Sequence, residues 1–168
     1  MDVLSPDVTA RVRLAERDER FLQLSSAKGL KEAEFLAVMV PAAKKDANAP
    51  EIKATSSLVR AQGWTGAKVE TGGRVVRAFF RTGAPGISTV DGITTDAERF
   101  TVEGDAAGGV KNVFMRGSEL RIGDISLKSG KQVSVSASFA PEGVELEADA
   151  ASDSDMTVGM AKAPVSVT

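Results

Sequence analysis

The side chains best suited to binding a ligand lie in residues 72–83, between a Gly-Gly turn and a Gly-Ala-Pro-Gly break. The β-branched and aromatic residues between these breakers predict a strand. Arg77, Phe79 and Arg81 then share one face, with the two arginines about 13 Å apart. Guanidinium groups pair bidentately with carboxylate or sulfate. This spacing predicts a carbohydrate-binding face for an extended acidic sugar chain.

A purely structural interpretation competes with that one. Val75 extends the apolar stripe on the same face, so Phe79 is also expected as a core residue. The two arginines would then lay their stems over the ring and pair with nearby acids such as Glu70. The opposite face, with Val76, Ala78 and Phe80, is fully apolar and is expected to pack in the core.

Three further features could carry chemistry. Trp64, the only tryptophan, is a candidate sugar platform or a cap on the edge of the core. Asp149, Asp153 and Asp155 cluster in a polar loop, but their spacing matches no EF-hand, so no metal site is predicted. The Gly-rich residues 104–109 precede a predicted strand rather than a helix, which indicates a hairpin loop and not a phosphate loop.

The composition argues against catalysis. The 168 residues include no Cys, His or Tyr, which removes the commonest general base, the commonest transition-metal ligand and any thiolate nucleophile. We therefore expect no enzyme activity, no catalytic residue and no cofactor.

The net charge of −2 gives no general attraction to nucleic acid or membranes. No apolar run is long enough for a transmembrane helix, and the first residues lack the features of a signal peptide.

The N-terminal region predicts two strand-forming segments. Residues 9–15 alternate and return through 21–25 after a charged turn, which favours a hairpin over a competing helix. Residues 32–40 are apolar throughout and end at Pro41, which predicts a buried strand. A polar surface loop follows at residues 42–50.

From residue 51 onward, turn signals recur every 8–12 residues, the spacing typical of an all-β sandwich. Turns are expected at 63–66 and 128–131. Strands are predicted at 51–59, 67–70, 87–93 (through an Asp91-Gly92 turn), 98–102, 110–115, 119–122, 125–127, 132–139 and 143–148, with one or two edge strands in 156–167. We expect one antiparallel β-sandwich domain over residues 1–168, with 1–8 and 150–168 as loose or edge segments.

Residues 90–102 and 112–122, with their Asp-Gly strand and strand-turn-strand pattern, resemble the C-terminal β-sandwich domain of heparinase II/III-like polysaccharide lyases, including alginate lyase-like members. The leading strand at 34–41 fits the same pattern, and the resemblance covers about residues 18–140. It implies an extracellular or periplasmic bacterial protein and a partner catalytic helical toroid. The family's catalytic Tyr and His have no counterpart here.

The resemblance implies a non-catalytic accessory domain that contacts acidic polysaccharide. Two alternatives stay open: a stand-alone carbohydrate-binding module, and a self-associating structural or surface protein that assembles through sheet edges.

Overall fold

The computed structural model describes residues 2–3, 8–14, 20–26, 37–38 and 54–160, with side chains from residue 54 onward. Within these residues the chain is all-β and contains no helix, which confirms the predicted class. The strands are β1 (Asp2–Val3), β2 (Val8–Leu14), β3 (Arg20–Ser26), β4 (Ala37–Val38), β5 (Ala54–Ala61), β6 (Trp64–Thr71), β7 (Arg74–Arg81), β8 (Ser88–Val90), β9 (Ile93–Thr95), β10 (Arg99–Asp105), β11 (Val110–Ile122), β12 (Ile125–Ala140), β13 (Gly143–Asp149) and β14 (Met156–Met160).

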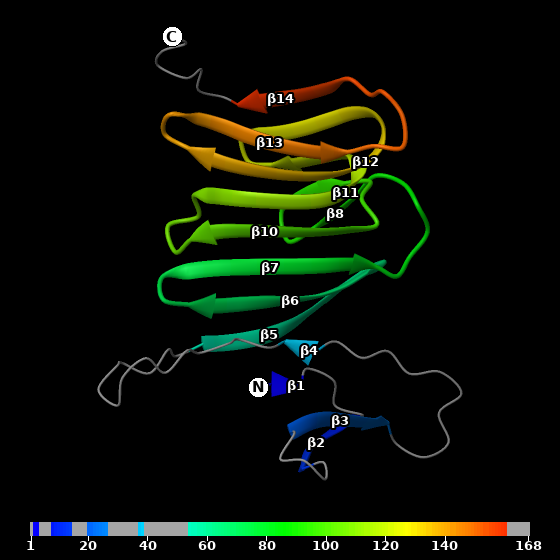
Figure 1. Cartoon of the computed structure of the whole chain (residues 1–168), viewed down its shortest axis with the longest axis vertical. Coiled ribbons are helices and arrows are strands. Elements are labelled where there is room, and N and C mark those ends of the chain that lie inside the picture. Colours follow the sequence, from blue (N-terminus) through cyan, green and yellow to red (C-terminus); the bar gives the residue numbers. More distant parts are fainter. Residues whose placement is uncertain (1, 4–7, 15–19, 27–36, 39–53, 161–168) are drawn as a thin grey trace.

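Ten strands, from β5 to β14, form one antiparallel sheet that curls and nearly closes into a barrel. Its main path runs β13-β12-β11-β10-β7-β6-β5, and Figure 1 shows these strands following one another as a ladder. A second branch adds β9 to β11, β8 to β9, and β14 to β12. The finer description as a two-sheet sandwich stays a prediction.

The two branches share β11 and β12, which are long enough to belong to both. The first half of β11 pairs with β10 and its last three residues pair with β9. The pairing of β11 with β12 shifts register between Gly117 and Glu119, and such an irregularity bends a strand. A Cβ on Gly117 would lie 2.6 Å from the Cα of Ala97. The close approach of that neighbouring backbone therefore requires glycine at this position.

The continuity of β11 and β12 corrects part of the strand assignment predicted from the sequence. The strands predicted separately at 110–115 and 119–122 are one strand, β11, and those at 125–127 and 132–139 are one strand, β12. Residues 128–131 were expected to form a turn, but they continue β12 through its bend. The Lys-Ser-Gly-Lys sequence there, with its glycine, weakens the regular strand geometry without ending the strand.

Buried residues from both branches form one core cluster. Val90 and Ile93 come from the β8–β9 hairpin, while Phe100 and Met115 come from the main path. The alternation predicted for residues 133–139 is confirmed, because the valines, Ala137 and Phe139 are buried and the serines between them are not.

The expected core face of β7 was wrong, whereas the competing expectation that Phe79 is a core residue is confirmed. Phe79 is 0% exposed and Phe80 is 44% exposed, so the face with Val76, Ala78 and Phe80 is the outer one. The physical reason lies on the neighbouring strand: Gly66 is opposite Phe79 and leaves room for its ring. A Cβ on Gly66 would collide with that ring and with the carbonyl oxygen of Ala78.

Several local predictions are confirmed. Strands β2 and β3 form the expected hairpin in the 9–25 region. Asp91 and Gly92 turn between β8 and β9 with φ of 49° and 75°, as a type I′ turn requires. Residues 106–109, within the predicted hairpin loop, join β10 to β11, and Gly109 N–H donates to Asp105 Oδ1 at 2.9 Å.

Other local predictions need correction or fall outside the described residues. The turn placed at residues 63–66 is wrong, since Trp64 already begins β6. Of the predicted strand at 32–40, the structure describes only β4. The predicted loop at 42–50 and the predicted strand residues after 160 lie outside the described residues.

Candidate functional site on the outer face of the sheet

The two aromatic candidates for sugar contact lie inside the core, which confirms the alternative core role expected for each. Trp64 and Phe79 are 1% and 0% exposed. Phe100 links them: its ring centroid is 5.3 Å from that of Trp64, edge-on, and 5.2 Å from that of Phe79, stacked. Neither ring offers an open face for stacking in this structure, since stacking needs a solvent-accessible ring.

Arg81 is occupied by the protein itself. Its guanidinium carbon lies 4.2 Å from the centroid of the Trp64 ring, a cation–π contact. Its Nε donates to the carbonyl of Ala97 at 2.9 Å, and Nη2 donates to the carbonyl of Thr95 at 3.1 Å. Nη1 donates to Ser88 Oγ at 3.0 Å. Arg81 therefore ties the segment after β7 to the core.

Arg77 lies away from this cluster, beside the β8–β9 turn. Its Nη1 is 3.5 Å from Asp91 Oδ2, and its Nε is buried without a hydrogen-bond partner among the described residues. Glu70, which the sequence suggests as its partner, pairs with Lys68 at 2.7 Å instead. The structure thus gathers Trp64, Phe79 and Arg81 in one place and leaves Arg77 apart.

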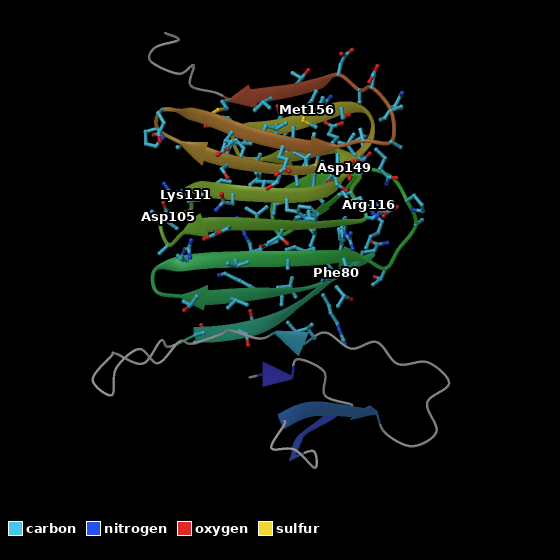
Figure 2. All side chains as sticks on the ribbon, viewed as in Figure 1. Phe80, Asp105, Lys111, Arg116, Asp149 and Met156 are labelled. Atoms are coloured by element: carbon cyan, nitrogen blue, oxygen red, sulfur yellow. The ribbon has the colours of Figure 1, made fainter. Side chains whose placement is uncertain are left out.

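The outer face of the same sheet carries a different constellation. Strand register places one residue from each of seven strands in a single transverse row. We call it the arginine row: Arg60, Thr65, Phe80, Arg99, Arg116, Ser134 and Asp149. In Figure 2, Phe80, Arg116 and Asp149 lie toward one end of the strands, while Asp105 and Lys111 lie toward the other.

Arg99 and Arg116 are direct cross-strand partners on β10 and β11. Like charges placed opposite each other on one face are destabilising. Arg116 is partly compensated, because its Nε is 3.3 Å from Glu98 Oε2. Arg99 forms no ion pair with any residue that the structure describes. The row therefore keeps an uncompensated guanidinium beside the exposed ring of Phe80.

A hollow of about 290 Å³ lies at the acidic end of the row. Its polar lining residues are Arg116, Gln132, Ser134 and Asp149. Glu98 contacts two of them, since its Oε2 forms an ion pair with Arg116 Nε at 3.3 Å and its Oε1 accepts from Gln132 Nε2 at 3.3 Å. The hollow thus combines donor groups, acceptor groups and both signs of charge.

Asp96 anchors the segment that positions Glu98. Asp96 Oδ1 accepts from the backbone N–H groups of Ser118 and Glu119, both at 2.8 Å, and Oδ2 accepts from the Ser118 hydroxyl. Burial alone would raise the pKa of Asp96. The hydrogen bonds from the Ser118 hydroxyl and from the backbone of Glu119, Ser118 and Asp96 together outweigh burial and lower the pKa below its ordinary value.

Of the three aspartates predicted to share a polar loop, Asp149 instead ends β13. The loop that carries Asp153 and Asp155 is held by contacts other than their carboxylates. Lys131 Nζ donates to the carbonyl of Asp153 at 3.1 Å, and Gly130 N–H donates to the carbonyl of Asp155 at 3.3 Å. Among the residues that the structure describes, no three carboxylates are grouped closely enough to hold a metal ion.

Sequence reasoning missed Phe80, Arg99 and Arg116 as a group. One signal was available: in residues 99–102, Arg99 and Thr101 alternate with the apolar Phe100 and Val102, which places Arg99 on a solvent face. Its neighbour Arg116 could not be identified without the register between β10 and β11.

Comparison with known proteins gives no match to a family model, a curated protein or a solved structure. The described part of the chain has no helix long and apolar enough to cross a membrane.

Proposed function

We propose that this chain is a non-catalytic accessory domain, of β-sandwich type, that binds acidic polysaccharide through the arginine row. The observation that carries the proposal is the cross-strand pair of Arg99 and Arg116 beside the exposed Phe80. An anion lying over both guanidinium groups would relieve their mutual repulsion. The site therefore lies on the opposite face of β7 from the residues first expected.

The side chains suit a chain-like anionic sugar. Guanidinium groups recognise carboxylate or sulfate with two parallel hydrogen bonds. Arg60 and Arg99 lie three strand positions apart along the row, about 14 Å at ordinary strand spacing. The Phe80 ring lies between them, where the apolar face of a sugar ring could rest. A polymer with an acidic group on successive units matches this spacing better than a single small anion.

The proposal includes no catalytic step. The sequence lacks His, Tyr and Cys, so acid–base chemistry at neutral pH would depend on carboxylates, lysine or arginine. Cleavage would then be supplied by a separate catalytic domain, such as the helical toroid implied by the resemblance, in an extracellular or periplasmic setting. Incubation of the purified chain with alginate should produce no unsaturated-uronate absorbance; growth of that absorbance would contradict the non-catalytic assignment.

Retention on an acidic-polysaccharide gel at low salt tests the binding role. The double variant Arg99→Ala/Arg116→Ala should elute at lower salt than the wild type, and the difference should shrink as ionic strength rises. The net charge of −2 makes nonspecific retention of the whole chain unfavourable.

A matched control removes two positive charges elsewhere. Lys111→Ala/Arg121→Ala changes two exposed residues that are not in the row, and it should leave retention near the wild-type value. Equal losses in both double variants would show that total charge, rather than the row, governs retention. No retention of the wild type at low salt would refute the binding role.

A further inference from the structure

We propose that the hollow lined by Arg116, Gln132, Ser134 and Asp149 is a subsite for one sugar unit, and that it makes the domain prefer uronate polymers over sulfated ones. This inference rests on the proposed function and specifies its ligand. The hollow continues the arginine row at β12 and β13, because Arg116, Ser134 and Asp149 are successive members of that row.

The size of the hollow limits its occupant. A volume of about 290 Å³ is at the lower end of the range for small-molecule sites. It accommodates one ring rather than an oligosaccharide, so the rest of a polymer would extend along the row over Arg99 and Phe80.

The polar lining is partly preorganised. Glu98 forms an ion pair with Arg116 Nε and accepts from Gln132 Nε2, which holds both side chains at the rim of the hollow. The outer nitrogens of Arg116 remain as donors, and Oε1 of Gln132 remains as an acceptor. Holding these groups in place before binding reduces the entropy lost when a ligand arrives.

The combination of donors and acceptors favours a ring with free hydroxyl groups. A hydroxyl both donates and accepts, so it can satisfy Asp149 and Arg116 together. A sulfate group can only accept, and near Asp149 it would meet a like charge. Asp149 forms no ion pair with any described residue, so its charge is available to repel sulfate. Unpaired or repelled groups in the wrong ligand are an effective source of specificity.

The test compares two polymers with the same purified chain: polygalacturonate, which carries carboxylates and hydroxyls, and dextran sulfate. Asp149→Ala should weaken binding to polygalacturonate about fivefold, the effect of losing roughly 1 kcal/mol of hydrogen bonding. The same change should leave dextran sulfate binding unchanged or stronger, because it removes a repulsive charge. Gln132→Ala should also weaken polygalacturonate binding selectively.

Glu145→Ala is the matched control, since it removes the same charge from the outer face of β13 at a position outside the hollow. Equal effects of Asp149→Ala on both polymers, or the same effects from Glu145→Ala, would overturn the subsite. A wild-type preference for dextran sulfate would also overturn it while leaving the proposed function intact. Failure of the wild type to bind either polymer would instead refute the proposed function itself.

Discussion

The guanidinium group of Arg81 lies 4.2 Å from the centre of the Trp64 ring and donates to the carbonyls of Thr95 and Ala97. One side chain on β7 thus covers the largest core residue and fixes the segment that leads into β10. A lysine could supply the charge but not the planar set of donors.

Replacement of Arg81 should therefore destabilise the fold. We expect Arg81→Ala to lower the free energy of unfolding by about 3 kcal/mol, and Arg81→Lys to lower it by more than half as much, because hydrogen bonds from charged donors are lost in both. Urea denaturation measures both values. Arg99→Ala is the control and should change the free energy of unfolding by less than about 0.5 kcal/mol. A similarly small effect of Arg81→Ala would contradict a structural role for Arg81.

Phe79 and Phe80 offer a direct test of which face of β7 is buried. Phe79→Ala should cost about 3–5 kcal/mol, because it leaves a cavity beside the ring of Phe100. Phe80→Ala should cost less than about 1 kcal/mol, since that ring is 44% exposed. Equilibrium unfolding of the two variants gives the comparison, and a larger loss from Phe80→Ala would reverse the assignment.

Gly66 should tolerate no side chain. The Cβ of Gly66→Ala would collide with the Phe79 ring and with the backbone oxygen of Ala78. Because the oxygen belongs to a paired strand, it cannot move without loss of the β6–β7 ladder, so we expect a loss of about 2 kcal/mol or more. Gly72→Ala controls for flexibility in the unfolded chain: its Cβ meets nothing within 4 Å, although its φ of +55° adds some strain. Equal melting temperatures for the wild type and Gly66→Ala would contradict the packing of Phe79 against this glycine.

The pH dependence of stability should reflect Asp96. Its pKa is lower in the folded state than in the unfolded state, so its ionised form contributes stability at neutral pH. That contribution should be complete above the unfolded pKa of about 4 and decline as pH falls through the lower folded value. Asp96→Asn should be less stable at pH 7 and should show a shallower decline between pH 5 and pH 2. If the stability of Asp96→Asn fell with pH as steeply as that of the wild type, Asp96 would not be the responsible group.

Calcium should not stabilise the domain. Asp149, Asp153 and Asp155 lack the spacing of an EF-hand loop, and binding to the folded state alone would raise the melting temperature by mass action. We expect equal melting temperatures in millimolar calcium and in chelator. A rise of several degrees that disappears in Asp153→Ala would show that the loop binds the ion.

The strands could be predicted largely because their signals are local. Alternation in residues 133–139 and the Asp91-Gly92 turn specify structure within a few residues. The bends in β11 and β12 could not be predicted, because Gly117 and Gly130 look like strand breaks. Only the packing of Gly117 against Ala97 explains why β11 continues.

The candidate site was harder to predict for two reasons. Both faces of β7 are rich in apolar residues, so its own pattern does not distinguish Phe79 from Phe80. The decision comes from Gly66 and Phe100 on neighbouring strands. Arg99 and Arg116 are distant in sequence and meet only through the β10–β11 register.

The sharing of β11 and β12 by both branches has a consequence for unfolding. If either branch detached, β11 and β12 would lose hydrogen-bonded neighbours, and the other branch depends on these two strands. Residues of both branches also contribute to one buried cluster. Residues 54–160 therefore contain no smaller part with an independent core. We expect them to melt as one cooperative unit, with the tryptophan fluorescence of Trp64 on β6 and the circular dichroism of the whole sheet changing at the same temperature.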